Sequence, residues 1–257
     1  MHVAGGLRRR ERNARQEGRS PANLPGASGI AIGTLRTRRQ RARLSVERLK
    51  RCYHSPKLNN KTDPLDELIF IILSQMTTGP SYERAFDRVK AAVSEWRRLT
   101  ETTESELALL IANAGLAGQR ARRIKQIADR LVNDFGEVSL ADLFHGDDEA
   151  VLRYLTSLPG VGVKTAKCVM MYSLNRQVLP VDTHTARVAV RLGLVSTGSP
   201  AAIDDELSVV VSPPLRFDFH VNAVAHGRSV CRAVRPHCDD CVLSLLCPVA
   251  RAANRSR

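Results

Sequence analysis

A short glycine turn between two helical patterns constrains this chain more than any other feature. The segment LPGVG, residues 158–162, follows the amphipathic run DDEAVLRYLTSL and precedes the run KTAKCVMMYSL. Gly160 and Gly162 can adopt backbone conformations that are closed to other residues, so a very tight turn can join the two helices. The pattern therefore predicts a helix–hairpin–helix.

The amide groups of such a hairpin have no partners inside a helix. Those of Gly160, Val161 and Gly162, with the start of the next helix, would present N–H donors and a positive dipole end to an anion. A DNA phosphate fits this kind of site, which holds a duplex without reading its sequence. The alternative is a plain helical connection in which the glycines serve only the turn.

Helical patterns recur along most of the chain. Asp63 and Pro64 have the order of a helix cap and a first helical residue, while Gly115, Gly136 and Gly193 follow helical runs. Alternating strand patterns are scarce, so we predict an all-α fold. The longest strong apolar run, LIFIIL at 68–73, is too short to span a bilayer, which argues against a membrane partner.

The positive charge of the chain is concentrated at its start. The formal net charge is +13, and residues 1–57 hold fifteen Arg or Lys against three Glu, which leaves 24 basic and 23 acidic groups for the rest. We expect residues 1–33 to be a disordered basic tail that strengthens non-specific DNA binding. An organelle-targeting segment is the alternative interpretation of this tail.

Four of the six cysteines lie near the C-terminus with the spacing C-x6-C-x2-C-x5-C, at Cys231, Cys238, Cys241 and Cys247. Four thiolates in a short loop suit either a [4Fe–4S] cluster or a structural zinc ion. The length of the chain and the lack of an apolar signal-peptide core argue against disulfides. Cys52 and Cys168 lie on helical patterns, and we expect them to be packed thiols.

These features together resemble one known family. The segment LPGVGVKTA, the segment VDTHTARV that follows it and the cysteine set are similar to the endonuclease III family of DNA glycosylases, in the helix–hairpin–helix, Gly/Pro–Asp superfamily. The resemblance covers roughly residues 34–250 and favours the [4Fe–4S] cluster over zinc. It implies a six-helix barrel lobe at 64–175, a cluster lobe formed by 34–63 and 176–257, and DNA lying between Lys164 and Asp182.

The resemblance also implies a reaction. Lys164 matches the family's nucleophile, and Asp182, eighteen positions later, matches its assisting carboxylate. Base excision develops positive charge at the sugar C1′ atom, which a carboxylate stabilises, and a neutral amine then captures that carbon as a Schiff base. Taken singly, Lys164 has the pattern of a solvated helix residue and Asp182 that of a helix cap. The implied protein is a monomer that excises oxidised pyrimidines from double-stranded DNA and cuts the abasic site by β-elimination.

Further residues are implied in handling the flipped base, because an enzyme that reaches a base inside a duplex must extrude it. Relatives fill the gap with a Gln in an LSAQATD-like segment, which reads LSQMTTG here. The ungapped match places Met76 at that position and Gln75 one earlier, and Gly79 replaces the acid that ends the motif. The other implied DNA contacts are a wedge at Leu116, a cation at Arg120 and the backbone-facing His184.

Two other functions remain open. The altered LSQMTTG segment permits a mismatch-specific or otherwise divergent glycosylase, and the cysteine set permits a non-catalytic iron–sulfur protein that binds DNA. The presence of Lys164 and Asp182 favours an enzyme, since binding alone needs neither. If the source is a prokaryote, we expect a cytoplasmic protein located at the nucleoid.

Overall fold

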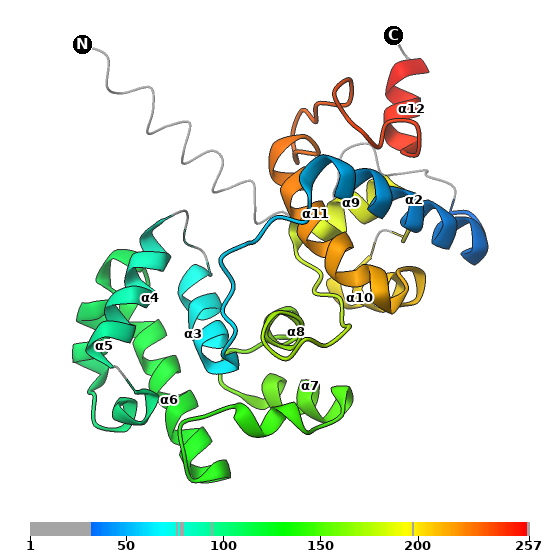
Figure 1. The fold of residues 1–257 in the computed structure, drawn as a ribbon. Helices are drawn as coiled ribbons and strands as arrows, with labels where there is room; N and C mark the ends of the chain where they lie inside the picture. The colour runs from blue at the N-terminus through cyan, green and yellow to red at the C-terminus, as the bar shows by residue number, and fades with distance from the viewer. Residues whose placement is uncertain (1–31, 76, 78–79, 94, 197, 256–257) are drawn as a thin grey trace, which may run out of the picture. The chain divides into compact units, whose positions relative to one another are not determined.

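The computed structural model describes residues 32–75, 77, 80–93, 95–196 and 198–255. Within these ranges every regular element is a helix, which confirms the predicted all-α fold (Figure 1). None of the helices described is long and apolar enough to cross a membrane. The expected basic tail falls outside the described ranges, apart from residues 32 and 33.

The described residues form two compact units, one between residues 59 and 176 and the other from the residues before 59 together with those after 176. The middle unit, residues 59–176, contains six α-helices and three short 3-10 helices among its described residues. They are α3 (Pro64–Ser74), α4 (Pro80–Ala92), η2 (Trp96–Thr100), α5 (Glu104–Leu110), η3 (Ala112–Ala114), α6 (Ala117–Phe135), η4 (Ala141–Phe144), α7 (Asp148–Ser157) and α8 (Val163–Tyr172). Helix α3 packs against α4, α6 and α8, while α5 packs on α6 and α7 packs on α8 (Figure 1).

Local signals explain where α3 lies. The Asp63 side chain caps it by accepting hydrogen bonds from the N–H groups of Leu65 and Asp66, at 2.9 and 2.8 Å, and Pro64 occupies the first turn. Its residues from 67 to 73 are all buried. A helix that is apolar on nearly every side must be surrounded by others, and α3 is therefore the centre of this unit.

One predicted helix is shorter than expected. The pattern suggests a helix over residues 82–96, but α4 begins at Pro80 and ends at Ala92, and Trp96 opens the separate helix η2. The break lets the Trp96 indole N–H donate to Asp66 at 2.6 Å, with the Lys90 ammonium 4.5 Å from the ring centroid. A buried indole needs such a partner for its N–H group.

The second unit combines the start and the end of the described chain. Its helices are α2 (Leu35–Tyr53), α9 (Thr183–Arg191), α10 (Pro200–Val210), η5 (Pro213–Leu215), α11 (Arg216–Ser229) and α12 (Pro248–Arg255). Helix α11 packs against α2 and α9, and α10 packs against the same two helices (Figure 1). Apolar side chains from these four helices make one continuous core that includes Leu49, Val188, Leu207 and Phe219.

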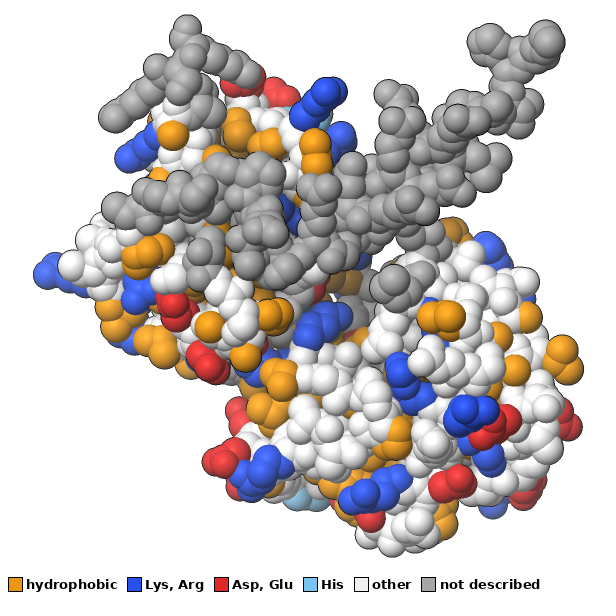
Figure 2. Space-filling view, turned by 180° about the vertical axis from the view of Figure 1, so that it is seen from behind, with side chains coloured by type: hydrophobic (Ala, Val, Ile, Leu, Met, Phe, Trp, Pro, Cys, Tyr) orange, Lys and Arg blue, Asp and Glu red, His pale blue; other side chains and the backbone are white. Residues whose placement is uncertain are grey.

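Charged side chains are mixed in sign on the surface. Figure 2 shows Lys and Arg side chains interspersed with Asp and Glu on the face it presents. Several form local ion pairs along one helix, such as Arg130 with Asp134 at 2.6 Å. This face therefore has no uniform positive field.

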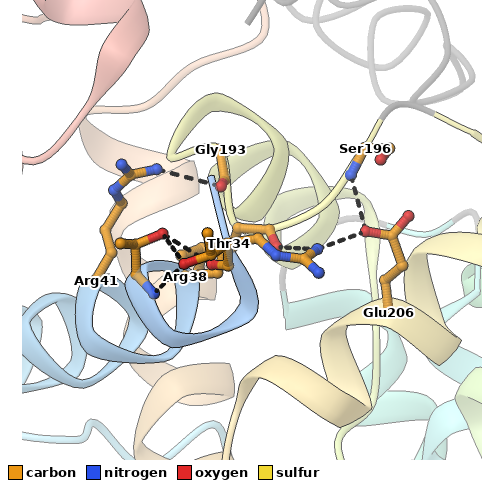
Figure 3. Close-up of polar contacts among 8 residues, drawn as sticks. Thr34, Arg38, Arg41, Gly193, Ser196 and Glu206 are labelled. Carbon is orange, nitrogen blue, oxygen red and sulfur yellow. Dashed lines mark hydrogen bonds and ion pairs between the residues drawn. The ribbon is translucent and has the colours of Figure 1, made fainter. Parts of the chain in front are cut away.

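Polar contacts anchor the N-terminal helix α2 to the C-terminal half of the chain (Figure 3). Arg38 Nη1 lies 3.0 Å from the Glu206 carboxylate, which also accepts a hydrogen bond from the Ser196 N–H at 3.2 Å. Arg41 Nη1 donates to the carbonyl groups of Leu192 and Gly193, at 2.9 and 3.2 Å. These bonds satisfy carbonyls at the end of α9, which would otherwise lack partners.

Candidate functional site

The structure confirms the hairpin between α7 and α8. Gly160 has φ of +71°, a left-handed conformation that favours glycine, and the Val161 N–H donates to the Leu158 carbonyl at 3.1 Å. The Val161 side chain is buried, and its amide closes the turn. Gly162, with φ of −92°, directly precedes α8 and is exposed. Gly160, Gly162 and the first two residues of α8 are exposed beside this turn, so an anion can approach their amides.

Lys164 is the second residue of α8 and is exposed. Its neighbour Thr165 is buried, so the helix turns the lysine outward while its next residues anchor the unit. A Cβ atom added to Gly162 would meet nothing within 4 Å, so the space beside this lysine is open. The position suits an amine that must reach a large external substrate.

Asp182 caps the start of α9 in the other unit. Its carboxylate accepts a hydrogen bond from the Thr185 N–H at 2.7 Å, as expected for a cap. Burial by itself would raise the pKa of Asp182, but the neighbouring His220 and the Thr185 N–H, with a smaller effect from His184, hold the pKa below its ordinary value. The group is therefore a carboxylate, able to stabilise positive charge.

His184 has a packing role in the same unit. A Cβ atom at Gly227 of α11 would come within 2.8 Å of the His184 Cβ atom, so only glycine permits this approach of α9 and α11. Arg187 Nη2 lies 2.9 Å from His184 Nδ1 and also donates to the Gly227 carbonyl at 2.8 Å. Burial lowers the pKa of His184, which favours a neutral ring. A contact with the DNA backbone stays a prediction for this residue.

Arg120 is placed differently from our expectation. It is only 3% exposed, and its guanidinium donates to the carbonyls of Leu73 and Ala114, at 2.9 and 2.6 Å, and also to the Gln75 carbonyl. Its cation therefore holds the end of α3 and the following loop together. This corrects the assignment of Arg120 as a DNA contact, because its donors are already used inside the unit.

The neighbouring Arg123 makes contacts that the sequence did not suggest. Its side chain packs on Gly160 of the hairpin, and its Nη1 atom donates to the Gln75 side-chain oxygen at 3.0 Å. Gln75 ends α3 and is partly exposed. Met76, the other residue considered for filling the gap of a flipped base, lies outside the described residues.

Leu116 has the features of a wedge. It is 59% exposed and has a left-handed backbone, with φ of +50°, immediately before α6. A large aliphatic residue is rarely found in that conformation. The loop thus holds an apolar side chain outward at a conformational cost, and an interaction with DNA remains its predicted role.

None of the four C-terminal cysteines forms a disulfide, and two buried arginines of α9 hold their loop. Arg187 Nε donates to the Cys231 carbonyl at 2.8 Å, and Arg191 donates to the Arg232 carbonyl at 2.7 Å. Arg191 Nη1 also lies 3.4 Å from the Cys231 sulfur, while the Cys247 thiol donates to the Arg191 carbonyl at 3.2 Å. The helix that carries Asp182 is therefore fixed to the cysteine loop.

Burial shifts the pKa values of two thiols of this loop and of a nearby histidine. Burial raises the pKa of Cys241 to about 11, and the other three thiols add to the effect, so all four lie near one another. His226, whose Nε2 atom is 3.5 Å from the Cys241 sulfur, has a pKa lowered by burial to about 4. Among the described residues, no three His, Cys, Asp or Glu side chains are arranged to hold a metal ion. The donor set itself, four thiols in one loop, fits an iron–sulfur cluster chemically.

The two remaining cysteines differ from each other. Cys168 is buried on α8, as expected for a packed thiol, but Cys52 is exposed on α2. The expectation for Cys52 was wrong because Val46 and Leu49 supply the buried face of that helix, and Cys52 lies off it.

The sequence did not single out Glu67, Arg187 or Arg191. The two arginines of α9 are four residues apart and thus share one helical face. That spacing could have indicated that they act together. Glu67 gave no such signal, because acids are common in the first turn of a helix and Asp66 lies beside it there.

Comparison with known proteins places these features in one family. Residues 69–213 match the HhH-GPD superfamily of base excision DNA repair proteins, and the chain belongs to this superfamily. Within it, the chain is an endonuclease III-like DNA glycosylase of base excision repair. It is 31% identical to endonuclease III of Thermotoga maritima over 196 residues, which cover 76% of this chain and 88% of that protein.

Solved structures show the same fold. A trapped endonuclease III–DNA covalent intermediate superimposes with a TM-score of 0.72 at 24% identity, covering 85% of this chain and 99% of that one. A thermostable thymine-DNA glycosylase gives a TM-score of 0.71 at 23% identity, covering 83% of this chain and 98% of that one.

Proposed function

We propose that this protein is a bifunctional DNA glycosylase that excises oxidised pyrimidines from double-stranded DNA and then cuts the abasic strand through Lys164. The observation that carries the proposal is the exposed lysine in the first turn of α8, directly after the hairpin. A second support is the ionised carboxylate of Asp182 at the start of α9. A protein that only binds DNA would need neither group.

The hairpin supplies phosphate binding in this proposal. The amides of Gly160 and Gly162 and the first turn of α8 meet a DNA phosphate, which positions the strand beside Lys164. The exposed Leu116 enters the duplex, and Gln75, held by Arg123, occupies the space of the flipped base.

The reaction then follows from the two side chains. As the bond between the base and C1′ breaks, its electrons leave with the base, which takes up a proton, and Asp182 stabilises the positive sugar. The Lys164 Nζ lone pair forms a bond to C1′, and opening of the sugar ring gives a protonated Schiff base. Loss of a C2′ proton expels the 3′ phosphate oxygen from C3′ and cuts the strand. Water releases Lys164 from the product.

The direct test is reduction with borohydride on a duplex with one abasic site. Hydride converts the Schiff base to a stable amine, so we expect a covalent complex with the wild type and none with Lys164→Ala. Lys57→Ala, an exposed lysine in the other unit, is the control and should trap normally. Absence of a complex with the wild type would overturn the lyase assignment.

We also propose that Cys231, Cys238, Cys241 and Cys247 hold a [4Fe–4S] cluster. The cluster would cross-link the loop that Arg187 and Arg191 fix to α9. Iron and acid-labile sulfide should be present in the purified protein and fall in Cys241→Ala, whereas the exposed Cys52→Ser should retain both. One tightly bound zinc in place of iron would contradict this assignment.

A mismatch-specific glycosylase is the second candidate. It is favoured by the altered LSQMTTG segment and by the similarity to a thymine-DNA glycosylase fold. A panel of duplexes with oxidised pyrimidines or with thymine mismatches separates the two candidates by the ratio of kcat/KM values. Faster excision from the mismatches would favour the second.

A further inference from the structure

We propose that Glu67 is a positioning residue whose buried carboxylate is the counter-charge for Lys164 and for the Schiff base formed from it. The inference rests on the proposed function. Glu67 lies on α3, which packs against α8, the helix of Lys164. It is 0% exposed, and the reaction described above does not use it.

The loop before α3 is built around this carboxylate. The Lys61 N–H donates to Glu67 Oε2 at 2.7 Å, and the Asn60 side-chain amide donates to Oε1. The loop is itself held by α8, because the Ser173 hydroxyl donates to the Lys61 carbonyl at 2.8 Å. Two donors aimed at one side chain indicate that the site accommodates an anion and fixes its direction.

Burial opposes this charge. It raises the pKa of Glu67, while the Lys61 N–H, the Asn60 amide and the positive charge of Lys164 act in the opposite direction. A fully buried acid with no electrostatic task is usually replaced by an apolar residue, because burying a charge is unfavourable. The presence of Glu67 among eight apolar buried residues of α3 therefore points to its charge.

Other cations near α3 have different contacts. Lys61 Nζ lies over the rings of Phe70 and Phe86, at 4.4 and 4.8 Å from their centroids, and its effect on the pKa of Glu67 is smaller than that of Lys164. From α4, Lys90 pairs with Asp66, and from α6, Arg120 binds carbonyls at the far end of α3. Among these cations Lys164 has the largest electrostatic effect on Glu67.

A fixed negative charge acts at two stages. Before DNA binds, it stabilises the ammonium form of Lys164 and so delays the appearance of the neutral amine as pH rises. After attack, it stabilises the positive nitrogen of the Schiff base, which an amide side chain cannot do. Removal of the charge should therefore have opposite effects at low and high pH.

The test is the pH profile of borohydride trapping by Glu67→Gln. We expect its acid limb to move to lower pH by about one pH unit, because the neutral amine forms more readily. The high-pH plateau should fall, roughly tenfold, because the Schiff base loses its counter-charge. The two profiles should cross. If Glu67 had only a structural role, Glu67→Gln would lower trapping at every pH and leave the acid limb at the wild-type pH. That result would overturn the proposal.

Two further variants serve as controls for Glu67→Gln. Glu67→Asp keeps the charge and should keep the limb at the wild-type pH even if its plateau falls. Glu83→Gln removes an acid that pairs with Asn59 in the same unit, at 2.9 Å, and should change neither limb nor plateau. Equal shifts in Glu67→Asp and Glu67→Gln would contradict a role for charge.

A measurement without DNA separates this inference from the proposed function. Lysines are dimethylated with 13C-formaldehyde, and the Lys164 signal is assigned by its loss in Lys164→Arg. Its titration midpoint should fall in Glu67→Gln and stay in Glu83→Gln. An unchanged midpoint overturns the proposal even if the wild type traps DNA. Failure of the wild type to trap DNA overturns the proposed function, and with it the catalytic use of Glu67.

Discussion

The side chain of Arg123 on α6 packs directly against Gly160, so that a Cβ atom at Gly160 would overlap the guanidinium. The same guanidinium donates to the Gln75 side chain at the end of α3. One arginine thus connects the hairpin to the residue proposed to fill the gap of a flipped base. Both contacts lie within the unit of residues 59–176.

Gly160→Ala should destabilise this unit by about 2–3 kcal/mol, because a left-handed alanine is strained and Arg123 must move. Urea unfolding followed by the fluorescence of Trp96, the single tryptophan of the chain, reports on the same unit. DNA affinity should fall as well, since Gln75 loses its partner.

Gly162→Ala is the matched control. Gly162 has an ordinary φ of −92° and open space around it, so the stability should change by less than about 0.5 kcal/mol. DNA affinity should still fall, because the new methyl group stands between the amide and the phosphate. Equal unfolding midpoints for the two variants would contradict the role assigned to Arg123.

Arg120→Met should be destabilising without altering the electrostatics of DNA binding. It leaves buried carbonyls of Leu73 and Ala114 without their donor, which should cost about 3 kcal/mol. Where the variant remains folded, the salt dependence of DNA binding should equal that of the wild type.

Arg122→Met is the comparison for Arg120. Arg122 is exposed and pairs loosely with Glu104 at 3.4 Å, so its loss should cost less than about 0.5 kcal/mol. A reduced salt slope in Arg120→Met, with normal stability, would restore the original view of Arg120 as a phosphate contact.

Leu116→Ala should lower base excision from duplex DNA by roughly tenfold while changing the stability by less than about 0.5 kcal/mol. The reason is that an exposed apolar side chain contributes little to folding but can fill a disrupted base stack. Leu109→Ala, at a site 77% exposed on the same unit, should change neither quantity. On a single-stranded substrate, Leu116→Ala and the wild type should excise the base at the same rate, since no base stack has to be opened there.

Features that depend on neighbouring residues were predicted well. The Asp63 cap, the helix end at Gly136 and the hairpin at 158–162 all occur as the local pattern indicates. Each is fixed by hydrogen bonds of backbone groups to partners within a few residues, so the sequence contains the whole cause.

Features that depend on packing between distant parts of the chain were predicted less well. Arg120 was predicted to contact DNA, although it shares the buried face of α6 with Ile124, Ile127 and Leu131. The helical period held that signal, but only the carbonyls at the end of α3 explain why an arginine is stable there. Glu67 is similar, because its donors come from the preceding loop and its charge partner from α8, almost a hundred residues later.

Two substitutions can separate the capping role of Asp182 from its electrostatic role. Asparagine is as good a cap as aspartate, so Asp182→Asn should retain stability at neutral pH, whereas Asp182→Ala should lose about 1 kcal/mol. Both variants should excise bases slower by on the order of a hundredfold, because neither carries the charge.

The pH dependence of stability provides a separate check on Asp182. Its pKa in the folded protein lies below the ordinary value of 3.8, so its ionised form stabilises the wild type above that pH. This contribution should disappear as pH falls through the lowered pKa, and Asp182→Asn should not show the loss. If Asp182→Asn excised bases at the wild-type rate, the carboxylate would be a cap alone.

Glu67 should give the opposite pH dependence. Its folded pKa is raised, so the folded state holds a proton that the unfolded state has already released once pH exceeds the ordinary value of 4.5. The corresponding stabilisation is complete below that pH and is lost as pH rises through the raised pKa. Relative to the wild type, Glu67→Gln should therefore gain stability from acid to neutral pH, as measured by Trp96 fluorescence. The same substitution should impair formation of the Schiff base, so Glu67 would lower the stability of the protein while it assists catalysis. If Glu67→Gln lost both stability and Schiff-base formation, that view would be refuted.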